Sequence, residues 1–136
     1  MKRQELPLTP ELASFVDSFA QLAVSLPKQM AMLCSEIETT EARMQALARQ
    51  GVIRAIPNWR TGRKGAYLTL VFPPDAEGKR PRKLIGRDPV EVNEALIAIE
   101  RAVEYDRLQG LLYRMMEKSL DASARAFQAR DALMCY

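Results

Sequence analysis

The sequence predicts an α+β protein, mainly α, in which two long antiparallel helices are joined at their closed end by a small three-stranded antiparallel β-sheet. Apolar residues recur every three or four positions on both sides of residues 52–88, which is the helical period. The stretch between holds four of the six glycines and a short alternating run typical of a strand. The two flanks are nearly equal in length, which favours a coiled-coil-like helical hairpin. We therefore expect a single domain over residues 1–136.

The first arm is expected over residues 9–51, after a short tail at residues 1–8. Thr9 is placed to cap the helix, Pro10 suits its first position, and Gly51 suits its C-terminal cap. Pro27 interrupts the apolar pattern. Because proline removes a backbone hydrogen bond and clashes with the preceding turn, we expect a kink or break there.

The head of the protein is expected over residues 52–88, with strands at Val52–Ile56, Ala66–Phe72 and Arg82–Ile85. Pro57 is taken as the end of the first strand. Alternation along the second strand places Leu68, Leu70 and Phe72 on one face. A sheet this small is marginal alone, so we expect the second helix to cover that face.

The second arm is expected over residues 89–134, starting from an Asp88 cap with Pro89 at the first position. If the two arms pair antiparallel along their whole lengths, Pro27 lies level with Gly110, where the glycine weakens the second helix. A two-helix hairpin buries one stripe on each helix, yet both helices have additional apolar positions. We therefore expect a homodimer that forms a four-helix bundle. Its interface residues would be Phe15, Phe19, Leu22, Leu112, Met115 and Met116.

Positive charge is concentrated in the head, which contains nine of the twenty Lys and Arg residues and three acidic residues. Cations that neutralise phosphates and planar side chains that stack are typical of nucleic-acid surfaces. Two alternatives are solvated charges that protect sheet edges, and a surface for an acidic protein. The candidate DNA-binding residues are Arg54, Arg60, Arg63, Lys64, Tyr67, Lys79, Arg80, Arg82, Lys83 and Arg87. Trp59 could stack on a base, although packing on the sheet or second helix is the more common role of a lone tryptophan.

Residues 60–104 carry a resemblance to a known family. The strand AYLTLVF, the turn EGKRPRKLIG and the capped helix DPVEVNEALIAIERA resemble the arm-type DNA-binding domains of phage tyrosine recombinases. In that family the sheet lies in the major groove and the helix backs it. The resemblance implies that Arg60, Arg63, Lys64, Tyr67, Lys79, Arg82 and Lys83 could face DNA. The order of helix, basic β-hairpin and helix also resembles small proteins of phages, plasmids and transposons.

Other classes of function find little support in the residues. The chain has no histidine, which removes the commonest general base and metal ligand. Cys34 and Cys135 form no ligand or disulfide motif, which suits a reducing cytoplasm, and Cys34 is expected in the core. We expect no catalytic residue, metal, cofactor or membrane span. The preferred hypothesis is a non-enzymatic DNA-binding accessory protein of a mobile element. The alternative is a protein–protein adaptor or inhibitor that acts through its helices or basic head.

Overall fold

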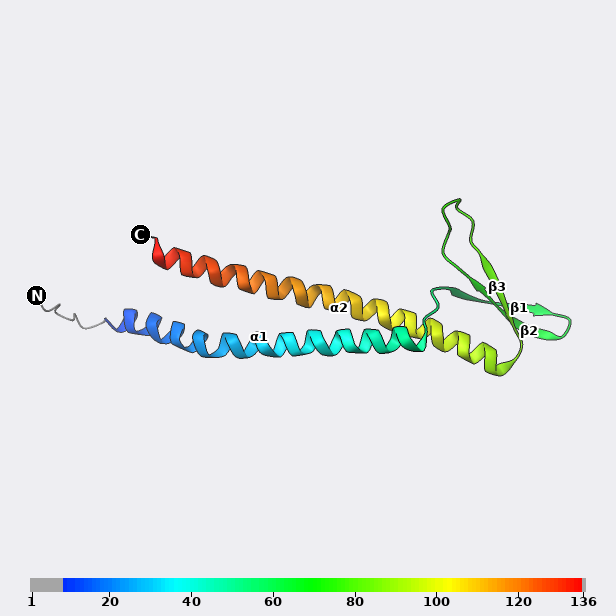
Figure 1. Cartoon of the computed structure of the whole chain (residues 1–136), viewed down its shortest axis with the longest axis horizontal. Coiled ribbons are helices and arrows are strands. Elements are labelled where there is room, and N and C mark those ends of the chain that lie inside the picture. Colours follow the sequence, from blue (N-terminus) through cyan, green and yellow to red (C-terminus); the bar gives the residue numbers. More distant parts are fainter. Residues whose placement is uncertain (1–8, 136) are drawn as a thin grey trace, which may run out of the picture.

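The protein is a long helical hairpin with a β-sheet at its closed end (Figure 1). The computed structural model describes residues 9–135, and the expected tail at residues 1–8 lies outside them. The elements are α1 (Pro10–Gln50), β1 (Ile56–Gly62), β2 (Gly65–Val71), β3 (Arg82–Gly86) and α2 (Pro89–Met134). The expected fold class and element order are confirmed. Neither described helix has a stretch apolar enough to cross a membrane.

Both helices begin at the caps that the sequence indicates. The Thr9 hydroxyl accepts a hydrogen bond from the Leu12 N–H at 3.3 Å, and the Asp88 carboxylate accepts one from the Val90 N–H at 3.3 Å. At the end of α1, Gly51 has φ +99°, a conformation that favours glycine. Gly51 and Asp88 therefore fix where the helices join the head, and Thr9 fixes the free end of α1.

The expected break at Pro27 is wrong, because α1 is one continuous helix through that residue. Pro27 is exposed, so the carbonyl that loses its helical partner can face water. The helix changes direction gently in this region (Figure 1).

The first strand lies later than predicted. β1 begins at Ile56, contains Pro57, and pairs with β2 through a two-residue turn at Arg63 and Lys64. Pro57 is tolerated because β1 is an edge strand of the sheet, whose order is β1-β2-β3. Residues 52–55 form a connecting segment instead, which is held by a 3.0 Å hydrogen bond from the Ile53 N–H to the Ala98 carbonyl of α2.

The inner face of the sheet packs on the start of α2, as expected. Leu68 and Leu70 have no exposed surface, and they form a cluster with Ala95 that Phe72 and Ile85 flank. Each buried leucine contributes roughly 1.5–3 kcal/mol relative to an exposed one. Alanines at this contact let the sheet approach the helix closely, which anchors the head on α2.

The pairing of the two helices differs from the predicted one. The first turns of α2 pack against the sheet, so α1 packs on residues of α2 that lie further along that helix. Met44 and Leu47 of α1 are buried together with Leu108 of α2. Pro27 therefore lies level with Ala126 rather than Gly110, and the two residues line a common pocket.

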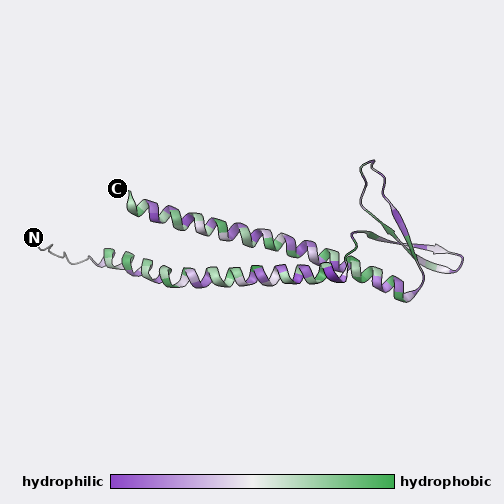
Figure 2. Ribbon diagram, viewed as in Figure 1, coloured by the Kyte–Doolittle hydropathy of each residue, from purple (hydrophilic) through white to green (hydrophobic). Residues whose placement is uncertain are grey.

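The helices diverge toward their free ends (Figure 1), and hydrophobic residues recur along both helices there (Figure 2). Many of these side chains are exposed. Of the predicted dimer residues, Phe15, Phe19, Leu22 and Met116 are exposed there. Met115 is buried and Leu112 packs against the core of the hairpin, so these two are committed within the chain. These two residues face α1 because the pairing of the helices is shifted from the predicted one.

Cys34, expected in the core, is exposed.

Candidate nucleic-acid interface

The sheet has an inner face toward α2 and an opposite face, which we call the open face. Residues paired across antiparallel strands project to the same side, and neighbours along a strand alternate. Leu68 and Leu70 define the inner face. The pairing then assigns the open face to Ile56, Asn58, Arg60, Tyr67, Thr69, Val71, Arg82 and Leu84. None of the three strands contains an acidic residue.

One end of the open face carries two arginines around an aromatic ring. Arg60 pairs with Tyr67 across β1 and β2. The Arg87 guanidinium lies over the Tyr67 ring at 5.4 Å from its centroid, and its Nη2 donates to the Gly65 carbonyl at 3.4 Å. A cation over an aromatic face is stabilised by about 0.5–1 kcal/mol at an exposed site. This end of the sheet therefore presents ordered positive charge.

Gly62 makes this arrangement possible. A Cβ atom at this position would lie 2.9 Å from Arg87 Nη2 and 3.3 Å from the Tyr67 ring. The missing side chain leaves the space that the Arg87 side chain occupies.

Positive charge at the other end of the open face comes from Arg82, which pairs with Val71. The seven residues of β2 span roughly 20 Å at about 3.3 Å each, which sets the separation of the two ends. Between them lie half-buried Asn58, buried Thr69 and Leu84, which is 65% exposed.

The turns extend the positive charge beyond the strands. Exposed Arg63 and Lys64 form the turn between β1 and β2. Exposed Lys79 and Arg80 lie in the loop before β3, where Asp75 Oδ1 accepts from the Lys79 and Glu77 N–H groups at 2.9 Å. The carboxylate thus orders the loop that carries these cations.

Two predicted residues lie elsewhere. Arg54 forms a 3.0 Å ion pair with Asp106 of α2 and lies over the Tyr105 ring. Lys83 pairs with Leu70, which assigns it to the inner face, and it lines a pocket with Glu91. The structure therefore does not place these two cations on the open face: Arg54 pairs with an acidic residue of α2, and strand register turns Lys83 to the inner face.

A lone tryptophan most often packs in the core, but Trp59 does not do so here. Its partner Leu68 is buried, yet Trp59 is 53% exposed and lies outside the buried clusters. Asn58 belongs to the open face, although the sequence did not indicate it. A first strand that begins at Ile56, instead of ending there, assigns Asn58 to the open face and Trp59 to the inner face by alternation.

Comparisons with models of protein families, with curated proteins and with solved structures find no match to this chain. The function of the open face therefore has to follow from its own charges and shape. Among residues 9–135, no three Asp, Glu or Cys side chains come together in a group that could hold a metal ion.

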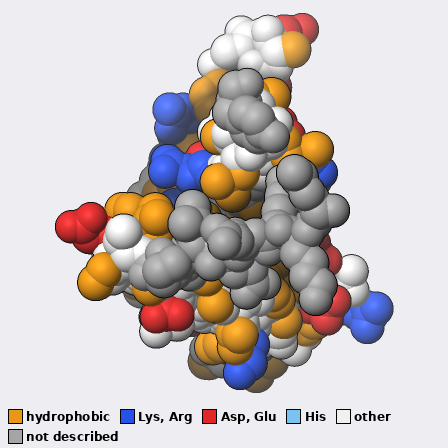
Figure 3. Space-filling model, turned by 90° about the vertical axis from the view of Figure 1, so that its left-hand side faces the viewer, with side chains coloured by type: hydrophobic (Ala, Val, Ile, Leu, Met, Phe, Trp, Pro, Cys, Tyr) orange, Lys and Arg blue, Asp and Glu red, His pale blue; other side chains and the backbone are white. Residues whose placement is uncertain are grey.

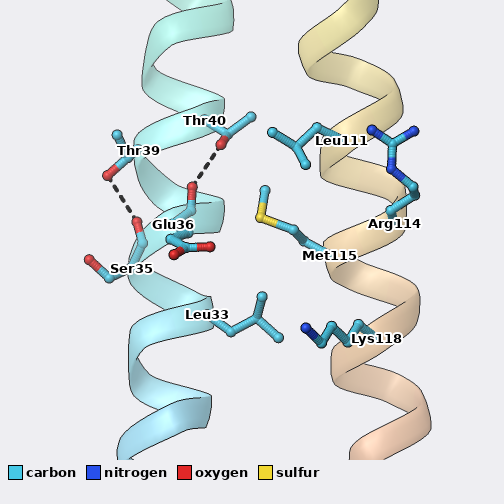
Figure 4. A pocket seen from close by; sticks show the side chains of 9 residues that line it. All are labelled: Leu33, Ser35, Glu36, Thr39, Thr40, Leu111, Arg114, Met115 and Lys118. Atoms are coloured by element: carbon cyan, nitrogen blue, oxygen red, sulfur yellow. Dashed lines mark hydrogen bonds between the residues drawn. The ribbon is translucent and has the colours of Figure 1, made fainter.

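A second candidate surface is the pocket between α1 and α2 (Figure 4). Leu33 and Thr40 of α1 point toward Leu111 and Met115 of α2. The Thr40 hydroxyl donates to the Glu36 carbonyl at 2.8 Å, so its methyl group is left for the pocket. The floor is therefore apolar, and Arg114 and Lys118 add charge from α2. Glu36 of α1 also lines the pocket, so charged side chains of both signs surround this apolar floor.

On α2 the Arg107 guanidinium hydrogen-bonds Glu104 at 2.7 Å and lowers the pKa of that carboxyl below its ordinary value. The side chains of this pair are partly exposed, and Arg43 of α1 also lowers the pKa of Glu104.

Proposed function

We propose that this protein binds duplex DNA through the open face of its sheet and acts as a non-enzymatic accessory protein. The observation that carries the proposal is the charge of that face. Arg60 and Arg87 lie at one end and Arg82 at the other, with no acidic residue in any strand. Guanidinium groups bind phosphates with several donors, and neutralising them releases counterions.

The dimensions of the sheet also support this proposal. Three strands at about 4.8 Å spacing give a backbone width of roughly 10 Å, close to the roughly 12 Å width of the major groove. Because α2 covers only the inner face, the open face can approach a duplex. Arginines at the two ends would then contact phosphates, while Asn58 lies between them, where a base edge would be.

The biological setting is part of the proposal. The order of helix, basic β-hairpin and helix, and the resemblance of residues 60–104 to arm-type domains, favour an accessory protein of a phage, plasmid or other mobile element.

The test compares two double variants of the head that remove the same charge. Arg60→Ser/Arg82→Ser alters the open face, and Arg54→Ser/Lys83→Ser alters cations that lie off it. Affinity for a short duplex is measured by fluorescence anisotropy over a range of salt concentrations. For the open-face variant we expect weaker binding and a slope of log K against log salt that is smaller by about 2, since each phosphate contact contributes about 0.9. The off-face variant should behave like the parent. Equal losses in both variants, or binding by the parent that does not depend on salt, would contradict the proposal.

A second candidate function is a protein–protein adaptor or inhibitor. The exposed apolar side chains at the free ends of the helices favour it, since such surfaces are typical of protein contacts. The salt titration separates the candidates, because an adaptor has no need to bind duplex DNA.

A further inference from the structure

The free ends of α1 and α2 expose a large apolar surface, which we call the distal surface. Its members are between 44% and 72% exposed, and they are Leu12, Phe15, Phe19, Leu22, Leu26, Met116, Leu120, Phe127 and Met134. Figure 3 views the molecule from this end and shows hydrophobic side chains at the surface around both helix ends.

On α1 the distal surface continues a stripe that is already used. Thr40, Met44 and Leu47 are buried near the head, where they face α2. The same face continues outward through Leu33, which lines the pocket between the helices, to Leu26 and Leu22. The stripe loses its partner because the two helices diverge (Figure 1). Near the head the stripe packs on α2, and the same period persists toward the free ends, where α2 has moved away from it.

On α2 there are two apolar stripes. Leu112 and Ala126 lie on the face toward α1. A second stripe recurs every seven residues, at Tyr113, Leu120, Phe127 and Met134, and its members are 58–72% exposed. Tyr113 follows Leu112 and Phe127 follows Ala126 by one position, so the two stripes are roughly 100° apart. Two such stripes are typical of a helix with two helical neighbours in a four-helix bundle.

On α1, charge is sparse where the surface is apolar. Residues 10–34 of α1 carry only Glu11, Asp17 and Lys28, whereas residues 35–50 carry five charged side chains. Interface cores are depleted of charge in the same way.

The area is also of the size that a stable dimer needs. Nine side chains, each exposing about half of the 150–250 Å² of a large residue, give on the order of 900 Å². The largest apolar patch of a typical monomer is about 300–600 Å², and a standard interface buries about 800 Å² on each partner.

We infer that the distal surface binds a second copy of this chain, with the seven-residue stripe of α2 packed on the exposed stripe of α1 from the partner. A second copy fits because each chain carries both halves of the contact, which makes the interface self-complementary. The contact also repeats the α1–α2 packing that the chain forms near its head. The Met115 and Leu112 positions stay within each hairpin, and the second copy uses Leu120 and Phe127 instead.

This assembly uses a surface at the opposite end of the molecule from the open face (Figure 1). The dimer would therefore carry two free sheets. Where the proposed DNA binding holds, two sheets on one particle raise the affinity for a duplex with two sites through effective concentration.

The test is the molar mass of the full chain in solution, measured by light scattering at several concentrations. The chain has a mass of 15.4 kDa, and we expect twice that value. Leu120→Glu/Phe127→Glu should give a folded monomer, because both side chains are exposed in the single chain and contribute nothing to its core. The matched control Gln128→Glu/Ala132→Glu adds the same charge on exposed positions of another face of α2 and should remain dimeric.

Two outcomes overturn the inference. A monomeric parent chain would show that the distal surface binds no second copy, including the case in which residues 1–8 cover it. A stripe variant that stays dimeric while folded, as judged by circular dichroism, would place the interface elsewhere. Neither outcome bears on DNA binding, since Arg60→Ser/Arg82→Ser should stay dimeric and Leu120→Glu/Phe127→Glu should keep the parental salt slope on a single-site duplex.

Discussion

The Arg87 guanidinium lies over the ring of Tyr67, 5.4 Å from its centroid, although the two residues belong to different segments of the head. Arg87 follows β3 and Tyr67 lies in β2, so the contact forms only when the sheet closes. It adds a cation held by Tyr67 to the end of the open face that carries Arg60. The glycine at position 62 supplies the space for it.

Replacing Gly62 with alanine should weaken DNA binding with little effect on stability. The new Cβ would lie 2.9 Å from Arg87 Nη2, which is the far end of a flexible side chain and can move away. We expect the slope of log K against log salt to fall by about 1, as for the loss of one phosphate contact. Gly110→Ala is the control, because a Cβ atom at this position inside α2 would lie 3.7 Å from Arg114 Nη1, which is an ordinary contact distance. That variant should gain about 0.5–1 kcal/mol of stability and bind DNA normally. Normal binding by Gly62→Ala would show that the position of Arg87 over the Tyr67 ring has no role in DNA binding.

The ends of both helices and the central strand could be predicted because their signals are local. Thr9, Gly51 and Asp88 act through neighbouring backbone groups, and alternation marks the inner face at Leu68. The start of β1 could not be obtained in this way. Pro57 predicts the end of a strand unless that strand is known to lie at the edge of the sheet. Which strand lies at the edge depends on the pairing of all three strands, which the local sequence does not show.

The pairing of the helices was missed for a similar reason. Periodicity shows which face of α2 is apolar. It does not show that Ala95 packs on the sheet while Leu108 packs on α1. The candidate site was predicted as a cluster of cations, and the structure divides that cluster by register. Arg60 and Arg82 share the open face, whereas Arg54 pairs with Asp106 of α2 and Lys83 lies on the inner face.

The stability of the head should depend on Leu70 far more than on Leu84. Leu70 has no exposed surface, whereas Leu84 in the neighbouring strand is 65% exposed. Leu70→Ala leaves a cavity between the sheet and α2 and should reduce the free energy of unfolding by about 2–5 kcal/mol. Leu84→Ala should change it by less than about 0.5 kcal/mol. Urea denaturation followed by circular dichroism gives both values at one protein concentration. Similar losses in both variants would mean that the inner face is not the core of the head.

The pH response of Glu104 should depend on Arg107. The hydrogen bond from Arg107 lowers the pKa of the Glu104 carboxyl, and Coulombic attraction adds to that effect. A lowered folded-state pKa means that the pair stabilises the fold above the unfolded pKa, and that this contribution is lost as the pH falls through the lower folded value. Arg107→Gln should therefore raise the Glu104 pKa toward its ordinary value in an NMR titration of the carboxyl carbon. Arg125→Gln, which removes the partner of Asp121, should leave the Glu104 titration unchanged. An unaltered Glu104 pKa in Arg107→Gln would refute the assignment.

Replacing Pro27 with alanine should stabilise the protein, because α1 already runs through this position as a helix. Alanine restores the backbone N–H that proline lacks and so permits the missing helical hydrogen bond to Ala23. The larger entropy of the unfolded chain offsets part of this gain, which leaves about 1–2 kcal/mol. Thermal and urea unfolding at fixed protein concentration measure it, since self-association would otherwise shift the transition. Pro89→Ala is the control. This proline occupies the start of α2, where no intrahelical N–H bond is lost, so its replacement should change stability by less than about 0.5 kcal/mol. If Pro27→Ala instead destabilised the chain, the bend at Pro27 would itself be needed for packing.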